Sequence, residues 1–292
     1  MKDRGYFSIR SFLIHLYQVI RWGAKLGWDL EGNWLPAWGF LLFSLIAPIA
    51  GVLMVVFMYR VVSGGALSGE FSCFLLPGMV GFLFIRQILT YSGYVVIEDR
   101  EHYRLLRYTY IVPFPLGIQV LARVLPRYAI STAGAVVVLG IGGWAMGVRL
   151  DLKAVDWGSS IAALVVALVA IQALGWILAS LMLLIDRMGW VFAEGISGVL
   201  FLASGAAFPL TILPQGLQQL GYILPITYWL DIWRVAFFGT NSLRTFPHIA
   251  THQLWTLFLL TTLIWVVIAF LWGQMANRWA RRWGRIERET FY

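Results

Sequence analysis

Charged residues are scarce in this chain. Of its 292 residues only 12% are charged, whereas soluble domains average about 25%. Hydrophobic residues make up 60% of the sequence, and the mean hydropathy is +0.77. This balance excludes an ordinary soluble globular domain and predicts an integral membrane protein.

Cysteine and histidine are also rare, and a nucleotide-binding motif is missing. Cys73 is the single cysteine, which excludes an internal disulfide. The four histidines are scattered without metal-ligand spacing, so we expect no metal site. No G-x-x-x-x-G-K-S/T loop occurs, so we expect that the chain alone is not an enzyme, binds no cofactor and hydrolyses no nucleotide. The net charge of +8 arises from basic residues that flank apolar segments, which argues against a nucleic-acid partner.

Long apolar segments define the fold class. Each has about the 20 residues that a helix needs to cross a bilayer, and they occupy 35–59, 71–96, 116–148, 158–185, 189–209 and 254–276. Residues 1–34 combine apolar positions at helical spacing with basic residues, which is typical of an amphipathic interfacial helix. The first apolar run is too long for a signal peptide, so we expect no cleavage. The sequence therefore predicts an all-α integral membrane protein with six transmembrane helices in 35–292, preceded by an interfacial helix in 1–34.

The distribution of lysine and arginine predicts the orientation. With the amino terminus inside, the inner flanks carry fourteen of these residues and the outer flanks carry five. Because basic residues accumulate on the cytoplasmic side, we expect both termini in the cytoplasm, including a basic tail at 277–292.

The most polar interruption between apolar segments is 97–115, called the polar segment below. Its acidic residues come first and its arginines follow, an order that suits a helix dipole and predicts a helix over 97–112, ended by Pro113 and Pro115. One side of this helix would carry Arg100, Arg104 and Arg107. An adjoining stripe would consist of Tyr103, Leu106 and Tyr110. The alternative is a solvated loop whose arginines only fix orientation.

A second unusual region is 208–239, where prolines divide an apolar stretch. Pieces between Pro209, Pro214 and Pro225 are too short to cross a bilayer, so we expect two short re-entrant helices packed over the outer end of the bundle. This region is a candidate exit gate. Its candidate residues are Phe208, Pro209, Pro214, Pro225, Tyr228 and Arg234.

Two charges lie inside predicted spans, Arg86 and Glu194. Such charges are costly and usually functional, and the two lie about 9 Å apart in depth at 1.5 Å per residue. A structural ion pair and a role in transport both remain open. Ser197 lies in a G-x-S-G motif seen in intramembrane proteases, but His248 and His252 are expected on the opposite side of the membrane, so close helix packing is the preferred interpretation.

Two stretches together resemble the ABC-2 type exporter permeases. Their loop after the second span reads approximately D/E-R-E-x-G-T-L-x-x-L-x-x-S-P, and this chain has the corresponding residues from Glu98 to Pro113, with His102-Tyr103 in place of small residues. Their last extracellular region resembles F-P-x-x-x-L-P-x-x-L-x-x-L-x-x-x-L-P-x-T followed by arginine. The matching residues are Phe208, Pro209, Leu213, Pro214, Leu217, Leu220, Leu224, Pro225, Thr227 and Arg234.

The resemblance implies a permease subunit of an exporter in the plasma (inner) membrane of a prokaryote. It implies a second permease subunit, identical or paralogous, and separate ATP-binding subunits that hold ATP and Mg²⁺. In that family the loop after the second span is a coupling helix seated in a groove of the ATPase. The candidate coupling residues are Glu98, Arg100, Glu101, Tyr103, Arg104, Leu106, Arg107 and Tyr110. The expected substrate is a lipophilic drug, a lipid or a lipid-linked glycan, and membrane lipid is an expected partner. The alternatives are an ion-coupled transporter that uses Arg86 and Glu194, and an intramembrane enzyme.

Overall fold

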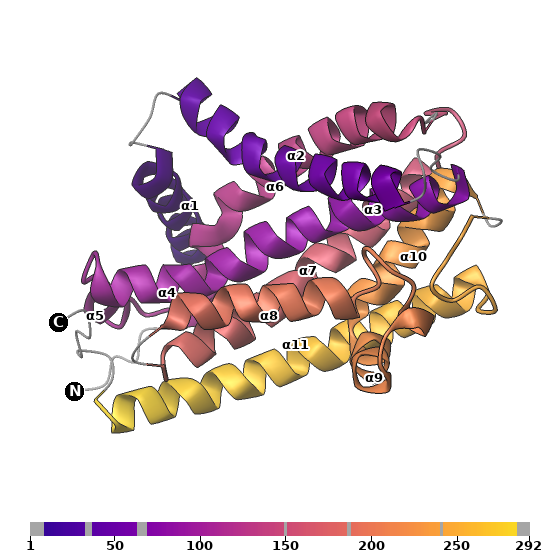
Figure 1. Ribbon diagram of the computed structural model, residues 1–292. Coiled ribbons are helices and arrows are strands. Elements are labelled where there is room, and N and C mark those ends of the chain that lie inside the picture. Colours follow the sequence, from indigo (N-terminus) through magenta and orange to yellow (C-terminus); the bar gives the residue numbers. More distant parts are fainter. Residues whose placement is uncertain are drawn as a thin grey trace, which may run out of the picture.

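Helices account for the regular structure of the chain. The computed structural model describes residues 9–32, 37–62, 69–148, 151–185, 188–239 and 242–284, and within these ranges it contains helices and turns but no strand. Figure 1 shows long helices running side by side, with α5 at one end of the bundle and α9 and α10 toward the other. The predicted all-α class is confirmed.

Among the residues that the structure describes, four helices are long and apolar enough to cross a membrane. They are a continuous helix over Gly69–Glu101, α6 (Leu116–Met146), α7 (Trp157–Met182) and α11 (Thr251–Arg282). The first consists of α3 (Gly69–Ile85), a π-helical turn η1 (Arg86–Thr90) and α4 (Tyr91–Glu101). These helices establish a multi-pass membrane protein.

The first and fifth predicted spans coincide with α2 (Ala37–Val62) and α8 (Gly189–Ala203). At 15 residues α8 is about 22 Å long, short of the roughly 30 Å hydrocarbon layer. It ends six residues before the predicted boundary because the chain turns at Ser204 and Gly205, where Gly205 has a φ of +71°. Six complete spans therefore remain a prediction.

The bundle is organised around two central helices. α7 packs against α4, α10 (Pro225–Phe238) and α11, whereas α6 packs against α1 (Ile9–Gly32), α2 and α3. Figure 1 shows α1 running crosswise to the long helices near the end that carries α5. A side chain at Gly27 would overlap the backbone carbonyl of Arg123, so glycine allows α1 to lie directly on α6.

The helix predicted over 97–112 is wrong. α4 ends at Glu101, the chain turns, and a single helical turn, α5 (Leu106–Thr109), follows. The turn contains Arg104 with a φ of +54°, a left-handed conformation that interrupts a right-handed helix. The sequence pattern located the polar region but not this break.

The region 208–239 contains a short 3₁₀ turn, η2 (Leu210–Ile212), then α9 (Gln215–Ile223) and α10. Pro209 and Pro214 directly precede η2 and α9, and Pro225 is the first residue of α10. Proline suits these positions because its fixed φ favours a helix start and its missing N–H is not needed there. Whether α9 and α10 dip into the membrane remains a prediction.

Candidate functional site

Arg100 connects the polar segment to the end of α7. Its side chain is buried, and its guanidinium donates to the carbonyls of Met182, at 3.1 Å, and Ile185, at 2.8 Å. It also pairs with Glu101 at 2.8 Å. A cation suits this place because the last carbonyls of a helix have no partners within the helix. Arg100 was predicted on an exposed basic surface, and that placement is wrong.

A buried ion pair joins α4 to α6. The Arg123 guanidinium donates through Nη1 to the carboxylate of Asp99, and both side chains are buried. The remaining buried donors of Arg123, Nε and Nη2, have no partner in the described part of the chain. Neither residue was among the candidate site residues. The signal was present, because an arginine seven residues into an apolar helix needs a counter-charge.

Further hydrogen bonds hold the rest of the polar segment. The Gln119 amide on α6 donates to the carbonyls of Thr109, at 2.9 Å, and Phe114, at 3.0 Å. The Tyr110 hydroxyl donates to Asn277 on α11 at 2.8 Å, and the Arg281 guanidinium lies 4.8 Å from the centre of the Tyr110 ring. Burial raises the pKa of Tyr110. The segment therefore contacts α6, α7 and α11 at once.

The predicted docking stripe does not form on the surface. Leu106 is buried within the chain, Tyr103 is half-buried and Tyr110 faces α11. The reason is the break at Arg104, which removes the helical spacing that would align these three side chains. The exposed side of the segment instead carries Arg104, Arg107, Tyr108, Ile111 and Val112. Glu98, which was also predicted at this site, is half-buried near the end of α4.

Arg86 and Glu194 form an ion pair between η1 and α8. Their closest nitrogen and oxygen lie 3.8 Å apart, and the Tyr94 hydroxyl donates to Glu194 at 3.1 Å. The two charged side chains are 59% and 42% exposed on the surface of this chain. The structure thus favours pairing, but on an exposed face rather than in the interior that an intramembrane charge usually faces.

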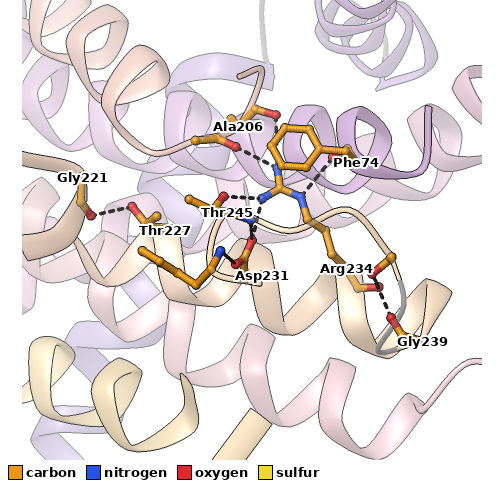
Figure 2. A network of polar contacts seen from close by, with 11 residues as sticks. Phe74, Ala206, Gly221, Thr227, Asp231, Arg234, Gly239 and Thr245 are labelled. Atoms are coloured by element: carbon orange, nitrogen blue, oxygen red, sulfur yellow. Dashed lines mark hydrogen bonds and ion pairs between the residues drawn. The ribbon is translucent and has the colours of Figure 1, made fainter. Parts of the chain in front are cut away.

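Arg234 is the centre of a second buried network (Figure 2). Its side chain is fully buried, and its guanidinium lies 3.6 Å from the centre of the Phe74 ring on α3. The guanidinium donates to Asp231 and Thr245 through Nη1, to the carbonyls of Gly205 and Ala206 through Nη2, and to the carbonyl of Phe74 through Nε. These five contacts match the five N–H groups of arginine.

Asp231 completes this network. Its two carboxylate oxygens accept from the backbone N–H groups of Thr245, at 2.9 Å, and Phe246, at 2.8 Å. The network therefore joins α3, the turn after α8, α10 and the loop before α11. We call Phe74, Asp231, Arg234 and Thr245 the arginine clamp.

Other predicted gate residues surround the clamp. The Tyr228 ring stacks on Phe246 at 5.1 Å, and its hydroxyl donates to the carbonyl of Tyr222 at 2.7 Å. Phe208 is half-buried, with its ring 6.3 Å from that of Tyr59. These contacts brace α9 and α10 against their neighbours.

The described residues do not assemble a catalytic or metal centre. Ser197 is buried, and its hydroxyl has no hydrogen-bond partner there, so no histidine acts on it. No group of three or more metal-ligating side chains comes together in the ranges that the structure describes.

Apolar helices long enough to span a bilayer define a polytopic membrane protein, and a polar segment is fixed at one end of its bundle. The family model of the ABC-2 type transporters matches residues 31–238, which is more than half of the chain, so the chain belongs to that family. No curated protein matches it. The suspected family is confirmed, and the chain is a membrane permease component of an ABC-type transporter.

Proposed function

We propose that this chain is the permease subunit of an ABC exporter and that separate ATP-binding subunits drive it. Two permease subunits, identical or paralogous, would form the path in the inner membrane of a prokaryote, with both termini cytoplasmic. ATP and Mg²⁺ would belong to the partner. The cargo would be a lipophilic drug, a lipid or a lipid-linked glycan.

The observation that carries this proposal is the two-sided construction of the polar segment. Its inner side is fixed to three long helices by Arg100, Gln119 and Tyr110. Its outer side exposes Tyr108 to 52% and Ile111 to 77%, beside the exposed Arg107. Apolar and aromatic side chains next to arginine are typical of the centre of a protein interface. A partner that binds the outer side would therefore act on all three helices.

Each inner contact connects the polar segment to a different helix, so a displacement of the segment can reach several helices. Arg100 leads to the turn between α7 and α8, Gln119 leads to α6, and Tyr110 leads to the last turns of α11. ATP-driven closure of the partner would move these helix ends together, because short hydrogen bonds and buried contacts transmit small displacements between rigid elements. In this scheme the arginine clamp fixes the opposite end of the bundle.

The experiment begins by identifying the partner. A photoactivatable amino acid at position 111 should crosslink, in native membranes, to a protein with a P-loop, whereas the same amino acid at Val136, exposed on α6, should not. The two subunits are then reconstituted, and ATP turnover and export are measured.

The double variant Tyr108→Ala with Ile111→Ala tests the exposed surface. It should weaken ATPase binding by about 100-fold, because truncating a central interface residue typically costs about 2 kcal/mol or more. Val136→Ala with Ile141→Ala on the exposed face of α6 is the matched control. Unchanged coupling in the Tyr108 and Ile111 variant would exclude this surface as the docking site. ATP turnover by the isolated permease would exclude the proposal that a separate subunit hydrolyses ATP.

The ion-coupled alternative gains no specific support. Its two charges bind each other and Tyr94, and the family match accounts for transport without them. Export that follows an imposed ion gradient in vesicles without ATP would revive it.

A further inference from the structure

A cavity of about 360 Å³ lies where α1, the polar segment, α4 and α6 meet. Its walls are mainly apolar, with Val19, Trp22 and Leu26 from α1, Val95 from α4, Val112 from the polar segment and Val120 from α6. Asp99 and Arg123 supply the polar part of its lining. Arg86 and Glu194 do not border this space, whereas Tyr108 of the proposed ATPase surface is one of its lining residues.

Arg123, which borders the cavity, has donors that the chain does not use. Arg123 Nη1 binds Asp99, but Nε and Nη2 are buried without a partner in the described chain. An unsatisfied buried donor costs about 1–3 kcal/mol, so an occupant that offers an oxygen acceptor is favoured over an empty or purely apolar filling. Arg234 shows the contrast, because protein groups occupy all its donors.

Two cations lie at the rim of the cavity. The Arg21 guanidinium and the Lys25 ammonium lie 5.7 Å and 5.4 Å from the ring centre of Trp22, which lines the cavity. Both side chains are exposed, and α1 also exposes Phe12, Leu13 and Tyr17. An apolar face with flanking cations is typical of a helix lying at the surface of an anionic membrane.

We propose that this cavity binds one anionic phospholipid of the leaflet in which α1 lies. An acyl chain would occupy the apolar walls, an ester or phosphate oxygen would accept from Arg123 Nε and Nη2, and the negative headgroup would lie near Arg21 and Lys25. A single lipid molecule combines these three chemical features. Because the cavity is bounded by both α1 and the polar segment, the bound lipid would hold these two elements together.

This inference needs only the membrane setting of the chain, and it is tested without the ATPase, so its outcome is independent of the proposed function. The purified full-length permease in detergent is titrated with phosphatidylglycerol and, separately, with phosphatidylcholine of the same acyl chains. Native mass spectrometry counts the lipids retained by each chain. We expect one tightly retained phosphatidylglycerol and at least about tenfold weaker retention of phosphatidylcholine.

Two variants fill the cavity from α1. Val19→Trp, and Gln18→Trp at an exposed position of the lining, should each weaken phosphatidylglycerol binding by about tenfold or more, since excluding about two acyl CH₂ groups suffices for that loss. Ile14→Trp is the matched control, because Ile14 is exposed on the same helix outside the lining. Retention equal to the original protein in both cavity variants would overturn the proposal. Because Gln18 is exposed, its variant remains informative if Val19→Trp fails to fold.

A third variant tests the headgroup. Arg21→Gln with Lys25→Gln should make retention of the two lipids nearly equal, whereas Arg278→Gln with Arg282→Gln, exposed at the end of α11, should not. Equal retention of both lipids by the original protein would refute the anionic specificity. Retention of no lipid at all would mean that the cavity holds only water, and the proposal would then be wrong.

Discussion

Two buried arginines, Arg234 and Arg123, show how differently the two ends of this permease are built. Arg234 donates to five protein acceptors and stacks on Phe74, with Asp231 held by two backbone N–H groups. Arg123 has one protein acceptor group, Asp99, and borders a cavity. A satisfied network specifies a single arrangement, so the clamp is complete within the chain, whereas Arg123 keeps two buried donors without a partner in the described residues.

The largest effect is expected from breaking the clamp. Arg234→Met should lower the free energy of unfolding by about 3–5 kcal/mol, because it leaves the Asp231 carboxylate buried without its counter-charge. Thermal unfolding in detergent, followed by near-ultraviolet circular dichroism, measures the change. The double variant Arg234→Met with Asp231→Leu removes both charges and should recover part of the loss. A single variant as stable as the original protein would contradict the contrast between the two ends.

The corresponding change at the other end should be milder. Arg123→Met leaves Asp99 without its partner, but the adjoining cavity can admit water to the carboxylate, so we expect a loss of about 1–3 kcal/mol. The same unfolding measurement applies, made with and without added phosphatidylglycerol. The lipid should stabilise the original protein and not this variant. A loss as large as that of Arg234→Met would mean that water reaches Asp99 no better than it reaches Asp231.

Between the two ends, the ion pair of Arg86 and Glu194 should contribute little to the free energy of unfolding. Because both side chains are substantially exposed, a double-mutant cycle should give a coupling energy of about 0.5–1 kcal/mol. Arg86→Glu with Glu194→Arg should recover stability or transport that either reversal alone removes. A coupling energy below about 0.5 kcal/mol would show that the two charges act separately.

The smallest expected effect is a pH dependence of the stability of the first turn of α7, near α10. Asp156 accepts a hydrogen bond from the Ser159 N–H at 3.1 Å, and hydrogen bonding from the Ser159 side chain and this N–H lowers the pKa of the carboxyl. A lowered pKa means that the folded state favours the carboxylate, so this support is present at neutral pH and is lost as the pH falls through the lowered pKa. Amide exchange of the first turn of α7 should therefore increase in acid relative to the rest of the helix. Asp156→Asn should remove this extra acid dependence, and an unchanged profile in that variant would assign it to another group.

The sequence was sufficient to predict the helical class and to locate the polar segment and the region 208–239, because these features depend on local composition. Runs of apolar residues predicted the four helices that are long enough to span a bilayer. Pro209, Pro214 and Pro225 marked helix starts because proline acts on its own backbone. Arg234 was singled out from a motif. Its partner Asp231 lies three residues earlier on the same helix, but its other partners lie in three further segments that only the fold brings near Arg234.

The polar segment shows where sequence reasoning failed. Spacing alone favoured a helix with an exposed basic side, but Arg100 turns inward and donates to carbonyls at the end of α7 and just after it. That need arises 82 residues further along the chain, at Met182, and no local pattern expresses it. Arg123 was not among the predicted site residues, and its partner Asp99 lies on another helix.

The π-helical turn η1 links the two arginine sites in a way that neither reveals alone. Phe74 of the clamp and Asp99 of the α6 pair lie on one continuous helix, before and after Arg86–Thr90. A π turn accommodates about one residue more than an α turn, and one residue corresponds to a rotation of about 100°. This extra residue therefore sets the angular phase between the two ends. Were the turn to relax to α-helical winding, Asp99 and Arg100 would rotate away from α6 and α7 while Phe74 stayed on Arg234.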